Sequence, residues 1–393
     1  PPVGPLLRPK PSGYALLGEA PSLILVTVDA FRSDHIGAYG YDRGITPNLD
    51  RIAQRGTVFE HAWSQDSGTG PSLWALMTGK TPFQVDLVDT HLFPPQLAEG
   101  EVTLAARLKE AGYTTEAVLC GYVFGQPNWN LRDGFDVHEE VCGSRKARQA
   151  EVTAAKAREA VRRLDGKQPY FLWVHFYDPH DPYEDHAALE LGDRPIDHYD
   201  EEIAYTDAFL AGFLEGVLGQ QRRRPTFVAL TADHGENFGE HGDAPHARTL
   251  YREVTQVPLM LWGPGVVSTR VDAPVAATDL FPTLLDLAGV PIPEDVTMTS
   301  QAMVAFGGAP DRERIVYQEN SFSRPKQHRK GAVSHTHHMI MNLSTGGVEL
   351  FDLRADPQET KNLYGTALAE EIRLERALRT FIPTTSVPTD LAK

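Results

Sequence analysis

The sequence predicts an α/β protein with a mostly parallel central sheet sandwiched by helices, followed by a small C-terminal antiparallel sheet and a closing helix. Two observations lead to this fold class. Before residue 291, apolar and β-branched runs alternate with helical segments, a pattern typical of a sheet covered on both faces. After Pro291 the runs are short and resemble antiparallel strands.

The elements of the large part follow in order. The run Ser-Leu-Ile-Leu-Val-Thr-Val at residues 22–28 has the composition of a central strand. A helix is expected to begin at Thr46, which caps it, with Pro47 at its first position. Further strands are expected at residues 115–119, 170–176, 225–230 and 257–262. Further helices are expected at residues 104–111, 146–164, 199–218 and 278–288.

The C-terminal part is expected to form its own small sheet. Its strands are predicted at residues 314–318, 338–341 and 348–352, and its final helix at residues 368–382. The chain is therefore divided into an N-terminal surface or linker segment (1–21), a large α/β domain (22–290) and a small α+β subdomain (291–393).

The composition argues against several classes of partner. With 37 Lys and Arg against 53 Asp and Glu, the formal net charge is −16, which disfavours nucleic acid or an anionic membrane surface as the main partner. The hydrophobic content of 41% is ordinary for a globular protein. We find no apolar run near the roughly 20 residues that a membrane helix needs.

The N-terminus and the two cysteines give indications of the cellular location of the protein. The chain begins at Pro1 without Met and shows no signal peptide. We expect that a signal or membrane anchor has been lost, and favour a periplasmic or extracellular location. Cys120 and Cys142 are expected to be two buried thiols, or one disulfide in an oxidising compartment. The oligomeric state is left open.

Residues 66–80 are predicted to form a turn followed by a helix, with a hydroxyl residue where the helix begins. Small and turn-forming residues precede Pro71, which suits the first turn of a helix. Thr69 should therefore sit at a helix N-terminus, where unpaired N–H groups and the helix dipole favour an anion. A hydroxyl at that place either caps the helix or attacks an anionic ester.

This stretch resembles the signature of the sulfatase family in the alkaline phosphatase superfamily, C-x-P-S-R followed by T-G-R or T-G-K. The family's first residue is a Cys or Ser that is oxidised to formylglycine, the nucleophile. Here Thr69 stands in that place, Leu73 replaces the Arg, and Lys80 closes the T-G-K. Thr cannot become formylglycine, so none is expected. Other branches of the superfamily use an unmodified Thr and act on phosphoryl groups.

Two further segments resemble the family's metal-binding motifs. Asp29 follows the first strand in a stretch similar to V-D-x-x-R-x-D-x-x-G, with Ala30 where many sulfatases carry a second Asp. Asp233 and His234 lie in T-A-D-H-G-E-N-F-G-E-H-G, close to the family's T-x-D-H-G-E-x-x-G-E-H-G. Carboxylates with a neutral imidazole favour Zn²⁺ or Mn²⁺, with Ca²⁺ and Mg²⁺ as alternatives.

Two histidines match other parts of the family pattern. His180 lies in F-Y-D-P-H-D-P-Y, similar to F-D-P-H-x-P-Y, where the family histidine faces the ester group. His246 lies where many sulfatases place a catalytic Lys. Residues 349–363 match the family's E-L-Y-D-L-x-x-D-P-x-E-x-x-N-L almost throughout, so the resemblance runs from about residue 22 to 382.

The resemblance implies a metal-dependent ester hydrolase with one divalent metal ion. Its predicted metal ligands are Asp29, Thr69, Asp233 and His234. Thr69 would attack the ester, Lys80 and His180 would hold its non-bridging oxygens, and His246 would protonate the leaving oxygen or bind a substrate oxygen.

The substrate follows from the nucleophile. A threonyl phosphate is ordinary chemistry, whereas a threonyl sulfate lacks the second hydroxyl through which formylglycine expels sulfate. Phosphate diesters, phosphonate monoesters or phosphoryl transfer are therefore the first expectation. The alternatives are a sulfatase without formylglycine and a degenerate sulfatase-fold binding protein. The partner would be an anionic small-molecule, glycan or lipid ester, with specificity set by loops such as 124–132 and 186–197.

Overall fold

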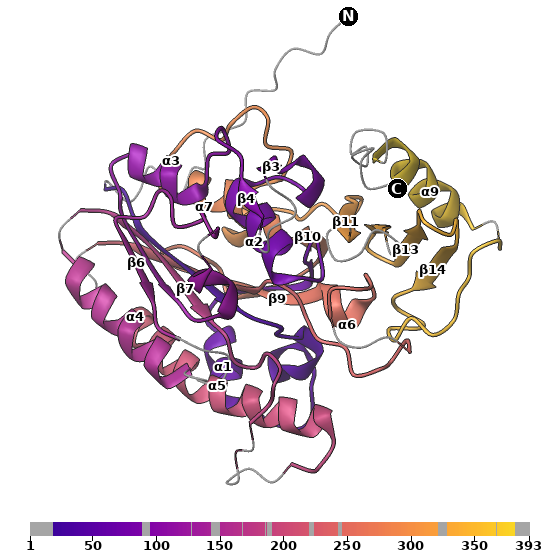
Figure 1. Ribbon diagram of the computed structural model, residues 1–393, viewed down its shortest axis with the longest axis horizontal. Coiled ribbons are helices and arrows are strands. Elements are labelled where there is room, and N and C mark those ends of the chain that lie inside the picture. Colours follow the sequence, from indigo (N-terminus) through magenta and orange to yellow (C-terminus); the bar gives the residue numbers. More distant parts are fainter. Residues whose placement is uncertain are drawn as a thin grey trace, which may run out of the picture.

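The computed structural model describes most of the chain. The described residues are 19–88, 95–126, 128–142, 150–166, 168–184, 186, 191–219, 224–242, 246–320, 328–366 and 368–381. They form an eight-stranded sheet between layers of helices, with a smaller sheet beside it (Figure 1). The predicted fold class is confirmed.

The large sheet has the strand order β10-β2-β9-β8-β1-β7-β5-β6. All its neighbouring strands pair in parallel except those of β9, which runs antiparallel to β2 and β8. The bounds are β1 (Ser22–Val28), β2 (Thr57–Trp63), β5 (Thr114–Leu119), β6 (Val137–Glu140), β7 (Tyr170–Phe176), β8 (Thr226–Ala232), β9 (Gln256–Trp262) and β10 (Thr269–Ala276). A separate two-stranded sheet joins β3 (Leu87–Val88) to β4 (Gln96–Leu97).

The predicted central strand lies in the middle of the sheet. β1 pairs with β7 on one side and β8 on the other, and every residue of the three strands is buried. A strand with helices on both faces needs apolar side chains on both, which explains the continuous apolar runs. The register aligns Val28 with Phe176 and with Ala232, so the segments after all three strands begin at one edge of the sheet.

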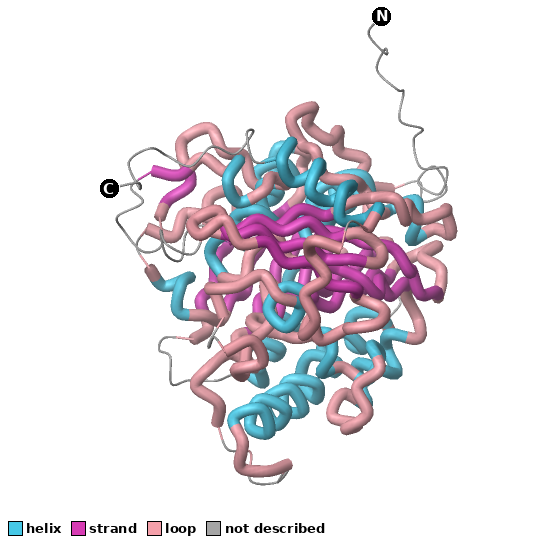
Figure 2. The backbone as a smooth tube through the Cα atoms, turned by 90° about the vertical axis from the view of Figure 1, so that its right-hand side faces the viewer, coloured by secondary structure: helices cyan, strands magenta, loops and turns pink. Residues whose placement is uncertain are grey.

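Helices cover both faces of this sheet. Figure 2 shows helices above and below the strands, and in Figure 1 α4 and α5 lie on one side and α2, α3 and α7 on the other. The bounds are α1 (Pro47–Ala53), α2 (Thr69–Thr78), α3 (Leu104–Glu110), α4 (Ala150–Leu164), α5 (Pro195–Leu218), α6 (Arg252–Thr255), α7 (Leu280–Ala288) and α8 (Ala302–Ala305). The first four residues of the predicted helix at 146–164 lie outside the described residues.

The C-terminal sheet has four antiparallel strands in sequence order. They are β11 (Val316–Asn320), β12 (Arg329–Val333), β13 (His337–Asn342) and β14 (Val348–Asp352), and α9 (Ala369–Phe381) packs on β12 and β13. The predicted boundary at residue 291 stays a prediction.

Several strands escaped prediction because their side chains are mixed. β2 carries the half-exposed Glu60 and His61 in its middle, where the pairing with β9 and β10 is irregular. β6 carries His and Glu residues at the sheet edge. β12 contains Arg329, Lys330 and Gly331, a composition that disfavours strands in general.

Cys120 and Cys142 form a disulfide, with their Cα atoms 4.9 Å apart. The expectation of two buried thiols was therefore wrong, and its disulfide alternative holds. The bond joins the end of β5 to the segment after β6, two neighbouring parallel strands. Among the described residues, we find no helix that is long and apolar enough to cross a membrane.

Candidate active site

The candidate site begins where β1 and β8 end. Asp29 and Asp233 directly follow these paired parallel strands, so their side chains are neighbours at the same sheet edge. Asp29 is 2% exposed and Asp233 is also 2% exposed. The backbone N–H of Ala30 donates to Asp233 Oδ1 over 3.2 Å. Ala30, which lacks the family's second carboxylate, thus contributes a backbone N–H to the site.

The structure brings the four predicted metal ligands together. His234 Nε2 lies 3.5 Å from Asp29 Oδ1 and 3.6 Å from Asp233 Oδ2. Thr69 Oγ1 lies 3.1 Å from the same nitrogen. The other ring nitrogen, Nδ1, lies 2.7 Å from the carbonyl oxygen of Gly235 and donates to it. This bond leaves the lone pair of His234 Nε2 facing Thr69 and the two carboxylates.

A fifth residue, His175, was missed by the sequence reasoning. It lies within β7 and is fully buried, with Nε2 3.7 Å from Asp29 Oδ2. Burial lowers the pKa of His175 to about 4, so its ring is neutral at neutral pH. The available signal was a lone His inside an apolar run. That signal is weak because a buried histidine usually has a structural role.

The residues of this cluster fit a divalent metal ion. Ligand atoms of Asp29, His175 and Asp233 lie within 4.8 Å of one another. Asp29 Oδ1, Asp233 Oδ2 and His175 Nε2 are buried without a hydrogen-bond partner in the part of the chain that the structure describes. Burial and the nearby Asp233 carboxylate raise the pKa of Asp29 to about 7. A bound cation would relieve both the crowding of carboxylates and the missing hydrogen bonds.

The nucleophile candidate is the first residue of α2. Gly68 precedes it in an extended conformation and donates its N–H to Asp66 Oδ1 over 2.9 Å. Thr69 itself is half-buried and lies at the end of the helix where N–H groups are unpaired. Leu73 stands four positions after Thr69, where the family carries Arg, and it is fully buried in the core. It offers the site no charge.

The C-terminal sheet holds the loop that leads to Thr69. Gln318 Nε2 donates to Ser64 O over 3.2 Å, and Glu319 N donates to Gln65 O over 2.8 Å. Asn320 Nδ2 donates to Ser67 Oγ over 2.9 Å. β11 therefore acts as a support for the nucleophile loop, which no sequence motif predicted.

His246 and Glu236 form a dyad beside the cluster. His246 Nδ1 lies 2.9 Å from Glu236 Oε1, and the His246 ring stacks on His234 with centroids 4.4 Å apart. Burial opposes a charge on His246, but the Glu236 carboxylate raises the pKa of His246 above its ordinary value. Burial would raise the pKa of Glu236, but His246 offsets this and the pKa of Glu236 falls to about 2. Each side chain of the dyad therefore favours the charged form of the other.

His180 joins the same group of rings, 4.9 Å from His246 between centroids. Its Nδ1 donates to the carbonyl oxygen of Asp181 over 2.6 Å, so the Nε2 lone pair is left for other partners. Burial lowers the pKa of His180. A neutral ring with one free lone pair suits proton acceptance better than the predicted role of holding ester oxygens.

Lys80 lies apart from these residues. α2 has 10 residues and ends at Thr78, so it is about 15 Å long, and Lys80 follows its C-terminal end whereas Thr69 begins it. Lys80 Nζ forms an ion pair with Glu101 Oε1 over 2.8 Å. The predicted role of Lys80 in holding the ester therefore has no support from the geometry.

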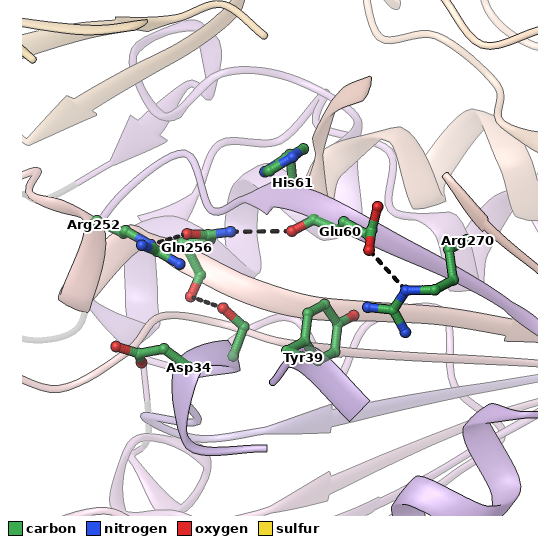
Figure 3. A pocket seen from close by; sticks show the side chains of 8 residues that line it. Asp34, Tyr39, Glu60, His61, Arg252, Gln256 and Arg270 are labelled. Carbon is green, nitrogen blue, oxygen red and sulfur yellow. Dashed lines mark hydrogen bonds and ion pairs between the residues drawn. The ribbon is translucent and has the colours of Figure 1, made fainter. Parts of the chain in front are cut away.

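An open polar pocket also lies beside β2, lined by residues of β2, β9, β10, α6 and the segment after β1 (Figure 3). Its lining comprises Ser33, Asp34, Tyr39, Glu60, His61, Arg252, Gln256 and Arg270. None of the residues predicted for the site is among them, and the charged side chains pair with one another, as Arg270 does with Glu60 over 2.7 Å. We do not include this pocket in the site.

Comparison with known families settles the relationship that the motifs indicated. The sequence model of the family Sulfatase matches residues 21–290, more than half of the chain. The chain belongs to the sulfatase family. A second model, N-sulphoglucosamine sulphohydrolase, C-terminal, matches residues 239–381 of this sulfatase-family protein. It is therefore an ester hydrolase of the alkaline phosphatase superfamily.

Known relatives of this sulfatase-family protein agree with that placement. It is 27% identical to a Delta 4,5-hexuronate-2-O-sulfatase of Bacteroides thetaiotaomicron over 91% of this chain and 90% of the relative. The structure of a 2-O GAG sulfatase superposes with a TM-score of 0.75 and 23% identity, covering 93% of each chain. The phosphonate monoester hydrolase of Agrobacterium radiobacter has a TM-score of 0.72 and 19% identity, covering 92% of this chain and 95% of its own.

Proposed function

We propose that this protein hydrolyses sulfate esters of an anionic glycan, with Thr69 as the nucleophile beside one divalent metal ion. The observation that carries the proposal is the position of Thr69 Oγ1, 3.1 Å from His234 Nε2 and at the start of α2. The similarity to a hexuronate-2-O-sulfatase over nine-tenths of both chains supports a sulfated sugar as the substrate class.

In the first step, Thr69 Oγ attacks sulfur and the bond from sulfur to the sugar oxygen breaks. The neutral ring of His180 accepts the hydroxyl proton of Thr69, and the His246 imidazolium donates a proton to the leaving sugar oxygen. Glu236 keeps His246 charged and fixes its ring through the 2.9 Å contact. The step ends with a threonyl sulfate, a free sugar hydroxyl and neutral His246.

In the second step, water attacks the sulfur of the threonyl sulfate. Neutral His246 now accepts a proton from this water, and the bond from sulfur to Thr69 Oγ breaks. Thr69 takes back its proton from His180, and hydrogen sulfate leaves. This displacement at sulfur replaces the elimination that formylglycine would permit, and both histidines return to their starting states.

The metal ion would be held by Asp29, Asp233, His234 and Thr69, with Zn²⁺ or Mn²⁺ favoured by the mixed carboxylate and imidazole set. When bound, it would supply positive charge that neutralises the sulfate oxygens and lowers the pKa of the Thr69 hydroxyl.

A second candidate is the hydrolysis of phosphate diesters or phosphonate monoesters. Thr69 favours it, because a threonyl phosphate is released by ordinary attack of water. The similar fold of a phosphonate monoester hydrolase also supports this candidate, because that enzyme cleaves a phosphonate ester. Phosphoryl transfer to an acceptor other than water belongs to the same candidate.

The compartment remains a proposal as well. The disulfide between Cys120 and Cys142 supports an oxidising environment such as the periplasm or the cell exterior. A sulfated glycan outside the cell would fit that location.

The test is a panel of matched aryl sulfate, phosphate monoester, phosphate diester and phosphonate monoester substrates, together with a 2-O-sulfated unsaturated disaccharide. Metal-loaded wild type is compared with Thr69→Ala and with the surface variant Thr366→Ala. Sulfate turnover that disappears in Thr69→Ala alone supports the proposal. Phosphoryl turnover without sulfate turnover establishes the second candidate instead, and turnover that survives in Thr69→Ala excludes Thr69 as the nucleophile.

A further inference from the structure

The neighbours of His175 hold its ring in one orientation, facing Asp29. The ring of Phe124 contacts it edge-on at 4.8 Å between centroids, and β7 holds its backbone between β1 and β5. Its Nδ1 lies 2.7 Å from Thr27 Oγ1, directly across the pairing of β1 with β7. Its other nitrogen, Nε2, is therefore aimed at the Asp29 carboxylate.

The spacing between the buried atoms is not that of hydrogen bonds. Asp29 presents one oxygen to each histidine: Oδ1 lies 3.5 Å from His234 Nε2, and Oδ2 lies 3.7 Å from His175 Nε2. Hydrogen bonds to carboxylates are shorter, about 2.7–3.2 Å. Two ligands of one tetrahedral ion, each about 2.1 Å from it, lie about 3.4 Å apart. Each separation is therefore close to that between two ligands of one ion, and Asp29 turns a different oxygen to each histidine, as a carboxylate that binds a metal through both oxygens can.

The hydrogen bonds behind His175 are compatible with a ligand. The Trp173 indole donates Nε1–H to Thr27 Oγ1 over 2.9 Å. A threonine hydroxyl has two lone pairs, so Thr27 can accept this N–H and the Nδ1–H of His175 together. His175 Nε2 then carries a lone pair, and Thr27 orients the ring in the way that outer-shell partners orient metal-binding histidines.

We propose that His175 is a ligand of the metal ion held by Asp29 and Asp233, and that it replaces the carboxylate missing at Ala30. This inference rests on the metal site of the proposed function, but it does not depend on which ester is cleaved. An imidazole in place of a carboxylate removes one negative charge and one hard oxygen from the site. The site should therefore bind Zn²⁺ or Mn²⁺ in preference to Ca²⁺.

The first experiment counts the ligands of the bound metal. Zinc K-edge X-ray absorption of the zinc-loaded full chain counts the imidazoles bound to the metal. The same measurement on His175→Gln is expected to show one imidazole fewer, with nitrogen ligands at about 2.0–2.1 Å in the wild type. An unchanged imidazole count in His175→Gln overturns the proposal, because the histidine would then act only through a neighbour.

The second experiment measures affinity. Titration of the metal-stripped chain with Zn²⁺ alone is expected to show about 100-fold or more weaker binding in His175→Gln, since even outer-shell partners contribute 10–100-fold. His338→Gln, which replaces another fully buried histidine, is the matched control and should bind as the wild type does. Equal affinity in His175→Gln and His338→Gln overturns the proposal.

A folding defect in His175→Gln is separated from ligand loss by the melting temperature of each metal-free chain. Addition of Zn²⁺ should raise the melting temperature of wild type and His338→Gln, and should raise that of His175→Gln much less. Binding and turnover are read separately, so zinc ligation by His175 can hold even if the substrate panel excludes sulfate esters. The result that two imidazoles bind zinc while no ester is cleaved would refute only the proposed function.

Discussion

His246 Nδ1 lies 2.9 Å from Glu236 Oε1, and the same imidazole stacks on His234, a predicted metal ligand, at 4.4 Å between ring centroids. His246 thus contacts both a buried carboxylate and one of the predicted metal ligands. This relationship explains how the half-buried His246 can serve as a proton donor. It also makes Glu236, which no sequence motif singled out as catalytic, the residue whose loss is most informative.

Glu236→Gln is expected to lower kcat by about 100-fold, the order of magnitude of general acid catalysis. The variant keeps the shape of the side chain but removes the charge that holds the proton on His246. The loss should be large for alkyl or sugar leaving groups and small for 4-nitrophenol, which leaves without a proton. Tyr183→Phe, which removes only a 3.2 Å hydrogen bond to Glu236 Oε2, is the control. An equal loss on both kinds of leaving group would contradict the assignment.

Asn320→Ala is expected to lower kcat by roughly 10–100-fold, because small misplacements of a reacting group cost that much. The change removes the 2.9 Å bond from Asn320 Nδ2 to Ser67 Oγ, which ties β11 to the nucleophile loop. Zn²⁺ affinity should change little. Ser67→Ala should behave like Asn320→Ala, and the double variant should be no worse than either, since both remove the same bond. Additive losses would show that the two residues act independently.

The buried ion pair between Lys330 and Glu319 supplies a prediction about stability. Both side chains are fully buried, and Glu319 Oε1 also accepts the Phe83 N–H over 2.7 Å. Lys330→Met should cost about 3–5 kcal/mol in the free energy of unfolding, because a buried carboxylate loses its counterion. Lys330→Met with Glu319→Gln should recover most of this loss. Urea unfolding measures both, and a double variant no more stable than the single one would refute the account.

His241 should make the stability depend on pH. His241 Nδ1 lies 2.8 Å from Glu253 Oε1, Nε2 lies 3.1 Å from the carbonyl oxygen of Glu359, and the ring stacks on Tyr251. Burial opposes the charge, but Glu253 raises the pKa of His241 from 6.5 to about 9. The folded state therefore holds the proton more tightly than the unfolded state, and the pair stabilises the protein fully below pH 6.5 and less as the pH rises through about 9.

The measurement is the difference in melting temperature between wild type and His241→Gln across that range. The difference should be largest at pH 6 and should shrink by pH 9.5, where His241 is neutral in both states. Glu253→Gln should remove the same pH-dependent part. A difference that stays constant with pH would show that His241 contributes only packing.

Local sequence patterns were sufficient to predict the elements whose residues are all in a similar environment. The strand at residues 22–28 is buried on both faces, so every residue of β1 had to be apolar or small. The helix from Pro47 was marked by residues with strong local preferences. β2, β6 and β12 were missed because their sequences mix polar and apolar residues. β2 is half-exposed in its middle, β6 has no buried residue, and β12 carries charged residues although most of it is buried.

The candidate site was predictable where a family motif marked it. Asp29, Thr69, Asp233 and His234 were named from their motifs, and the structure places them together. Lys80 was named from a motif as well, but the length of α2 separates it from Thr69. Glu236 was part of a recognised motif but had no assigned role, because its partner His246 is ten positions away along the chain.

The sequence by itself determined that acids and histidines follow the central strands, because strand ends, caps and motifs depend on neighbours along the chain. Only the tertiary structure decided which of them meet. The parallel register of β1 with β7 put His175 beside Asp29, and the antiparallel C-terminal sheet put Asn320 on the nucleophile loop. Contacts between residues more than a hundred positions apart depend on how whole strands pack, and no local pattern encodes that.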